Sequence, residues 1–141
     1  MSEYARTTNN VPTLLQPVVY FRVSAIALAL VAVLGFLLNI IGDGKQLSMN
    51  DTLLNFTYAH DVVHVVLAAA AFLFGFATLP GRTVRVFAII FGVVYAGLGI
   101  AGFFTLTASS GDTFLSLTPG VNVVHLALGG YALISGLMAK Y

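Results

Sequence analysis

Four long apolar stretches dominate the sequence and constrain its fold more than any other feature. They cover residues 17–41, 56–79, 83–104 and 121–138. About 20 apolar residues in a helix cross the ~30 Å hydrocarbon core of a bilayer. Proline stands only at or outside the borders of these stretches, where helices are expected to begin or end. With 59% hydrophobic and 8% charged residues, the chain is not a water-soluble domain, and we predict an all-α integral membrane bundle of four helices.

The positions of the basic residues predict the orientation of the spans. One side of the bundle is expected to carry Arg6, Arg22, Arg82, Arg85 and Lys140, and the other Lys45. Because short cytoplasmic loops are enriched in lysine and arginine, both termini are predicted to be cytoplasmic, with His64 and His125 near the outer face. The expected location is a prokaryotic plasma membrane, or a thylakoid membrane if the source is a cyanobacterium.

Composition also limits the partners of the chain. The net charge is +1 and no basic cluster is present, which argues against nucleic acid or a polybasic lipid-binding patch as partners. The absence of cysteine excludes disulfides, iron–sulfur clusters and thiolate-bound haem. Residues 1–16 are predicted to form a cytoplasmic tail and residues 17–141 one transmembrane domain. The expected contacts are therefore lateral, with the lipid bilayer, with other membrane subunits or with a second copy of the chain.

The chain contains an internal duplication. Residues 51–75 and 112–136 align at a shift of 61, with ten of 25 positions identical. A weaker match of Arg22 with Arg85, at a shift of 63, extends the duplication toward the N-terminus. The two repeats are predicted to cover about 17–79 and 80–141. Because each repeat is a helical hairpin that begins and ends on one side, the copies should be related by a pseudo-two-fold axis along the membrane normal.

Two histidines head matching stripes of small residues in the duplicated segments. At spacings of four, seven and eleven residues, the stripes contain Ala68, Ala71 and Gly75 after His64, and Gly129, Ala132 and Gly136 after His125. Small faces let helices approach closely in a bilayer, because lipid is as apolar as leucine. We therefore predict that both stripes face neighbouring helices, and that Phe72, Phe74 and Phe76 point toward lipid or a partner.

Each of these histidines follows an oxygen-bearing side chain by three residues, Asp61 before His64 and Asn122 before His125. Residues three apart share a helical face. In a purely structural interpretation, Asp61 and Asn122 bond the free N–H groups of a helix start, while the histidines bond across helices. This interpretation needs no ligand.

Three functional interpretations use the same residues. In the first, His64 and His125 are axial ligands of haem or chlorophyll, and Asp61 and Asn122 are the acceptors that orient the imidazoles. In the second, His60, His64 and His125 hold a metal ion such as zinc. In the third, Asp61 takes part in proton or small-solute conduction, because it is the only acidic side chain within a predicted span.

The segments around the histidines also resemble a known family. They read Leu53-Leu54-Asn55-Phe56, His60-Asp61-Val62-Val63-His64 and Asn122-Val123-Val124-His125-Leu126-Ala127-Leu128-Gly129. They are similar to the signature of a family of small four-helix membrane proteins from bacteria and archaea, a domain of unknown function. Asp61 replaces the asparagine that is usual in that family. The resemblance implies the four-helix fold and the importance of His60, His64 and His125, and it implies no reaction.

The sequence shows no arrangement of residues typical of an enzyme. The serines of the predicted outer loops lack an acid–histidine partner at a recognisable spacing. Because almost no mass lies outside the membrane, we predict a non-catalytic accessory or stabilising subunit of a larger membrane complex. The first alternative is a haem- or chlorophyll-binding protein, and the second is proton or small-solute conduction.

Overall fold

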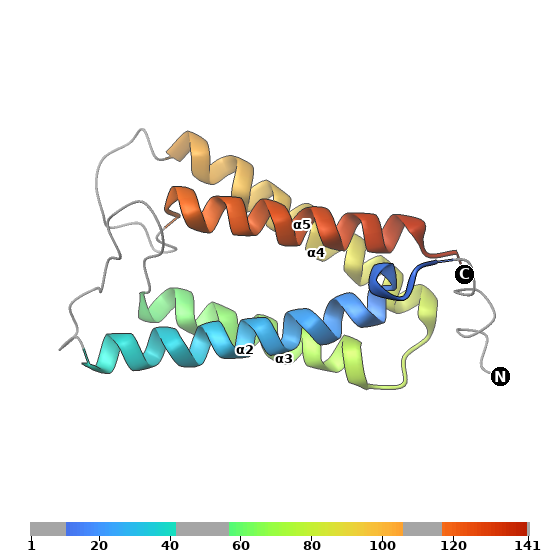
Figure 1. Ribbon diagram of the computed structural model, residues 1–141, viewed down its shortest axis with the longest axis horizontal. Helices are drawn as coiled ribbons and strands as arrows, with labels where there is room; N and C mark the ends of the chain where they lie inside the picture. Colours follow the sequence, from blue (N-terminus) through green and yellow to red (C-terminus); the bar gives the residue numbers. More distant parts are fainter. Residues whose placement is uncertain (1–10, 42–56, 106–116, 141) are drawn as a thin grey trace.

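The computed structural model describes residues 11–41, 57–105 and 117–140, and these form an all-helical bundle (Figure 1). A short 3-10 turn, η1 (Thr13–Leu15), precedes four long helices. They are α2 (Pro17–Ile41), α3 (Tyr58–Phe76), α4 (Gly81–Thr105) and α5 (Pro119–Met138). All four are long and apolar enough to cross a membrane, as the apolar stretches predict.

The predicted spans agree with these helices to within three residues at every end. Parts of the predictions lie outside the described residues, namely the tail over 1–10 and the repeated segments over 51–56 and 112–116. The prolines stand where they are tolerated: Pro17 and Pro119 open α2 and α5, where a missing backbone N–H costs no helical hydrogen bond.

Threonine caps the first turn of both α3 and α5. The Thr57 hydroxyl accepts a hydrogen bond from the backbone N–H of His60 at 3.2 Å, and the Thr118 hydroxyl accepts one from Val121 at 3.3 Å. The two threonines are 61 residues apart and therefore occupy the same position in the duplication. The interpretation of Asp61 and Asn122 as helix caps is wrong, because threonine already fills this role.

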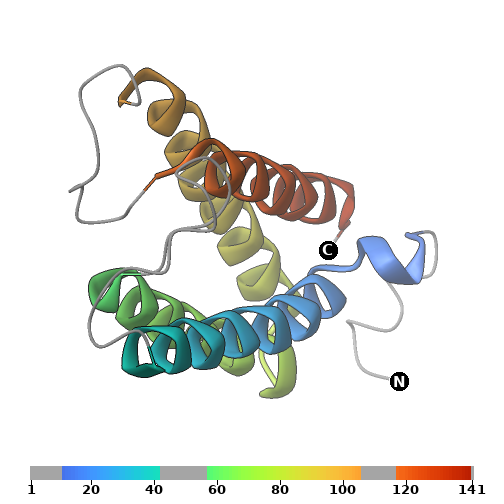
Figure 2. The same ribbon diagram turned by 60° about the vertical axis from the view of Figure 1, so that its left-hand side comes forward.

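The helices pair in the order in which they follow one another. Helix α2 packs along α3 and α4 packs along α5, whereas α2 has only small contacts with α4 and α5 (Figures 1 and 2). We call the two pairs the first and the second hairpin. Both predicted stripes of small residues are buried along the helix contacts, which confirms that they face neighbouring helices.

Each hairpin carries the same contact between an arginine and a backbone carbonyl. Arg22 Nε donates to the carbonyl oxygen of Gly75 at 2.8 Å, and Arg85 Nε donates to that of Gly136 at 3.0 Å. The arginines correspond at a shift of 63 and the glycines at a shift of 61. Both bonds tie the beginning of one helix to the end of the next within a hairpin.

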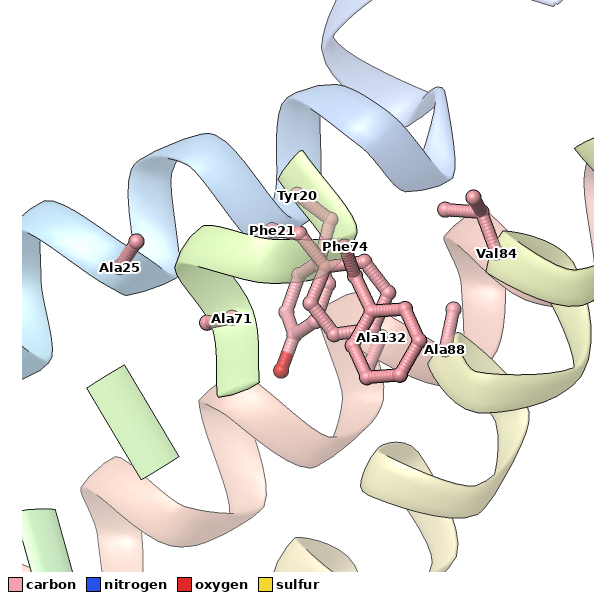
Figure 3. Close-up of a cluster of buried hydrophobic side chains, with 8 residues drawn as sticks. All are labelled: Tyr20, Phe21, Ala25, Ala71, Phe74, Val84, Ala88 and Ala132. Carbon is pink, nitrogen blue, oxygen red and sulfur yellow. The ribbon is translucent and has the colours of Figure 1, made fainter. Parts of the chain in front are cut away.

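The apolar core joins the two hairpins near the end of the bundle at which α2 begins and α3 ends (Figure 3). It contains Tyr20, Phe21, Ala25, Ala71, Phe74, Val84, Ala88 and Ala132. The rings of Phe21 and Phe74 lie 5.2 Å apart between their centroids. Residues of all four long helices therefore meet in this cluster.

One of the three phenylalanines expected to point outward is part of this core. Phe72 and Phe76 are 60% and 48% exposed, as predicted, but Phe74 is only 8% exposed. The physical reason is helical geometry. Residues four apart share a face, whereas a residue two positions away lies on the opposite side of the helix. The prediction for Phe74 was wrong because it treated the three residues as one group.

Candidate ligand site between the hairpins

His60 and His64 form the part of the candidate site that the first hairpin contributes. They are four residues apart on α3, so they share one face, and their ring centroids lie 4.3 Å apart. Only 3% and 7% of their surfaces are exposed. The two imidazoles are therefore packed together inside the bundle and do not extend to its surface.

The second hairpin contributes His125 from α5 and Tyr95 from α4. The His125 ring centroid lies 6.3 Å from that of His60 and 5.4 Å from that of Tyr95, which it meets edge to face. Both residues are buried. We call His60, His64, Tyr95 and His125 the histidine–tyrosine cluster. It is built by three helices and joins the hairpins.

Several polar atoms of the cluster have no hydrogen-bond partner among the residues that the structure describes. They are Nδ1 of His64, Nδ1 of His125 and the hydroxyl oxygen of Tyr95, all of them buried. Buried polar groups are nearly always hydrogen-bonded, and each one left unpaired costs about 1–3 kcal/mol. The cluster thus presents hydrogen-bonding capacity that the surrounding side chains leave unused.

Asp61 faces α2 and not the cluster. Its Oδ2 accepts a hydrogen bond of 2.9 Å from Nδ2 of Asn39, and Asn39 also donates to the carbonyl oxygen of Gly35 at 3.1 Å. A Cβ atom on Gly35 would collide with the Asp61 carboxylate. The carboxylate therefore holds α2 against α3, and the expected bond from an imidazole is not among its contacts.

Asn122 occupies the corresponding place in the second hairpin. Its side chain lies against Gly102 of α4 and would collide with a Cβ atom there. Neither polar atom of the side chain has a partner among the described residues. Asn39 has no counterpart here, because the position 63 residues later is Gly102 itself. Asp61 and Asn122 are thus both helix-packing residues, but within the described residues the side chain of Asp61 is hydrogen-bonded and that of Asn122 is not.

A line of aromatic rings connects the cluster with the apolar core. Tyr95 lies 6.1 Å from Phe91, and Phe91 lies 5.3 Å from Phe21 between ring centroids. Phe21 belongs to the core and meets Tyr20 edge to face. A continuous row of aromatic rings therefore runs from His125 to the apolar core and includes a contact between the hairpins, from Phe91 to Phe21.

Tyr95 and Asn39 are site residues that the sequence prediction missed. Both depart from the duplication, because Tyr95 stands where the first repeat has Ala32, and Asn39 stands where the second repeat has Gly102. The signal that could have revealed them is a difference between the repeats: a large or polar side chain stands on a packed face where the other repeat has a small one. His60 shows the same signal, because its counterpart is Val121.

The described residues contain no group of three or more histidine, aspartate or glutamate side chains arranged to hold a metal ion. His60, His64 and His125, which are the predicted metal ligands, lie instead as neighbouring rings whose planes are tilted toward one another. We therefore propose no metal-ion site at these residues.

The candidate site thus consists of three imidazoles and a phenol hydroxyl, which are buried where the two hairpins meet. No protein-family model, curated protein or solved structure that was compared with the chain matches it. The family resemblance of the histidine segments stays a prediction.

Proposed function

We propose that this chain is a non-catalytic integral membrane protein that holds a cofactor between its two hairpins, at the histidine–tyrosine cluster. The observation that carries the proposal is the convergence of buried, unpartnered polar atoms from both hairpins, at His64, Tyr95 and His125. A purely structural cluster would be expected to use these atoms in bonds between helices. A bound molecule offsets the cost of burying them.

The class of ligand that suits this chemistry is a tetrapyrrole. His64 and His125 come from opposite hairpins, and a haem or chlorophyll would use an imidazole as axial ligand and supply redox or light-absorbing chemistry. Ala68 and Gly129 lie one turn below these histidines, and such small side chains leave space for a flat ring. His60 is the one obstacle, because its ring neighbours both His64 and His125. A macrocycle bound by both must displace it.

Because a macrocycle bound by His64 and His125 must displace His60, the test distinguishes the two proposed ligands from His60. The protein would be purified from its native membrane in mild detergent, and its absorption spectrum would be compared among the wild type and four variants. We expect a stoichiometric Soret or chlorophyll band that is lost in His64→Ala and His125→Ala and is retained in His60→Ala. Ser135→Ala is the matched control, because Ser135 is also buried and unpartnered on α5. A colourless protein, or a band that survives both His64→Ala and His125→Ala, would refute the proposal.

A second candidate function is that of an accessory subunit with lateral partners. It is favoured by Gly97 of α4, where an added Cβ atom would meet nothing within 4 Å. Gly97 lies between the exposed residues Val93 and Ile100 on one helical face. No contact with the residues that the structure describes explains a glycine there, whereas small residues let a partner helix approach closely. Gly97→Leu should abolish co-purification of larger membrane subunits and leave the melting temperature of the isolated chain unchanged or higher.

The proton-conduction interpretation gains no support from the position of Asp61. Its carboxylate is fully buried and bonded to Asn39, so it serves a contact between helices.

We also propose that the hairpins are related by a pseudo-two-fold axis along the membrane normal, with both termini cytoplasmic. The corresponding pairs Thr57 with Thr118 and Arg22 with Arg85 support this relation, because each pair makes the same bond in its own hairpin. The chain contains no natural cysteine, so Thr78→Cys places one exposed label site between α3 and α4. We expect this site to be labelled from the cytoplasmic side alone. Labelling from the outside would contradict the proposed orientation.

A further inference from the structure

An open apolar groove of about 330 Å³ lies on the outer side of the first hairpin, between α2 and α3. Its lining includes four alanines and two aromatic side chains, namely Ala25, Ala29, Ala68, Ala69, Phe72 and Phe76. The two phenylalanine rings stack with their centroids 4.7 Å apart. The volume lies within the range of about 300–1,000 Å³ that is typical of small-molecule sites. The groove can therefore take an elongated apolar group.

Arg22 lies beside the groove at the Phe76 side. Its guanidinium carbon is 5.4 Å from the centroid of the Phe76 ring, and its Nε donates to the carbonyl oxygen of Gly75. The side chain is exposed. A guanidinium has five N–H donors, and this bond uses only the one on Nε. The backbone contact thus fixes the cation in place while the Nη groups stay outside that bond.

The spacing of the residues shows how the cation and the groove are aligned. Arg22, Ile26 and Ala29 lie four and seven residues apart, so they share one face of α2. Phe76, Phe72 and Ala69 are spaced in the same way on α3, which runs in the opposite direction. Seven residues of helix extend about 10 Å. The groove therefore leads from the guanidinium into the membrane-spanning part of the hairpin.

We propose that this groove binds one anionic phospholipid, with its phosphate on Arg22 and part of an acyl chain against the alanines. Guanidinium groups bind phosphate by short, charge-assisted hydrogen bonds. A cation at one end of an otherwise apolar groove matches an amphiphilic anion better than a partner helix. Anionic lipids are also attracted to basic residues at the membrane surface.

The second hairpin shows that the arginine alone does not create the groove. Arg85 repeats the contact with a glycine carbonyl, but Leu133 replaces Phe72 and Gly92 replaces Ala29. A Cβ atom on Gly92 would lie 2.5 Å from Cγ of Leu133. Leu133 thus occupies the space between the helices at this level. The second hairpin is therefore an internal control: it has the corresponding arginine, but Leu133 fills the space between its helices.

Native mass spectrometry of the delipidated full chain tests the proposal. Phosphatidylglycerol and phosphatidylcholine would be titrated separately into wild type and three variants. We expect wild type to prefer phosphatidylglycerol. Arg22→Gln should weaken phosphatidylglycerol binding about fivefold, which is the effect of one basic residue near an anionic surface. Ala69→Leu should weaken binding of both lipids by filling the groove, since this exposed side chain lines it.

Arg85→Gln is the matched control and should leave the affinity for phosphatidylglycerol unchanged. Equal losses in Arg22→Gln and Arg85→Gln would show that charge alone attracts the lipid, and would overturn the proposal. Unchanged binding in Ala69→Leu would also overturn it. Circular dichroism of each variant establishes that the helices are intact. The result is independent of any cofactor, because His64 and His125 are unaltered in all variants.

Discussion

The two hairpins differ in the contacts that hold their two helices together. In the first, α2 and α3 are joined by a buried side-chain hydrogen bond from Asn39 to Asp61. In the second, α4 and α5 approach through glycines, and a Cβ atom on Gly129 would lie 2.5 Å from the backbone nitrogen of Ala96. The counterpart of Gly129 in the first hairpin is Ala68. Duplicated helices can therefore diverge between polar bonding and close backbone packing while they keep one topology.

The difference also explains where the candidate sites lie. The first hairpin leaves an open groove on its outer side, and it supplies two of the three imidazoles at the contact between the hairpins. The second hairpin, with its glycine contacts, supplies Tyr95 at a position where the first has alanine. His64 and His125 are shared by the two copies, whereas His60 and Tyr95 each occur in one copy, so the histidine–tyrosine cluster combines the likeness of the copies with their divergence.

The largest effect is expected at the glycine contact of the second hairpin. Gly129→Ala places a methyl group against the backbone of α4, which cannot move aside as a flexible side chain does, and should lower the free energy of unfolding by about 3 kcal/mol. The neighbouring Gly130 is the control, because an added Cβ atom there meets nothing within 4 Å. Gly130→Ala should leave stability unchanged or raise it by up to about 1 kcal/mol. Unfolding in detergent, followed by circular dichroism, measures both; equal effects would contradict the close contact.

A second effect distinguishes the polar contact of the first hairpin from its counterpart. Asn39→Ala removes the donor to Asp61 and should lower the free energy of unfolding by about 2 kcal/mol, since a buried carboxylate oxygen loses its partner. Asn122→Ala should cost less than Asn39→Ala, because the amide that it removes packs against Gly102 but has no hydrogen-bond partner among the described residues. A double-mutant cycle of Asn39→Ala with Asp61→Ala should give a coupling of about 1 kcal/mol. A coupling near zero would show that the Asn39–Asp61 bond contributes nothing.

The fold could be predicted from the sequence because its determinants are local. Apolar length and proline position define a span within the segment itself, so the helices begin and end close to the expected residues. The stripes of small residues were likewise predictable, because helical periodicity alone places Ala68 and Gly129 on a packed face. These predictions needed no knowledge of how the hairpins meet.

The partners of polar side chains could not be predicted in the same way. The spacing of Asp61 and His64 places them three residues apart on α3, yet the carboxylate bonds Asn39 on another helix. The pairing of the helices depends on the sum of many small van der Waals contacts. A short sequence motif therefore does not predict which helices pack against each other. Tyr95 was missed for this reason, because only the packing of α4 along α5 brings its ring to that of His125.

The smallest expected effect concerns the arginine contacts that the two hairpins share. Arg22 and Arg85 bond a glycine carbonyl at similar distances, 2.8 and 3.0 Å, but Arg22 is exposed and Arg85 is half-buried. Water competes more strongly for an exposed bond, and exposed charge interactions are worth little. Arg85→Gln should therefore lower the free energy of unfolding by about 1 kcal/mol and Arg22→Gln by about 0.5 kcal/mol, as measured by unfolding in detergent. The opposite order would mean that Arg22 has the greater structural role and that its loss of lipid binding reflects an altered hairpin.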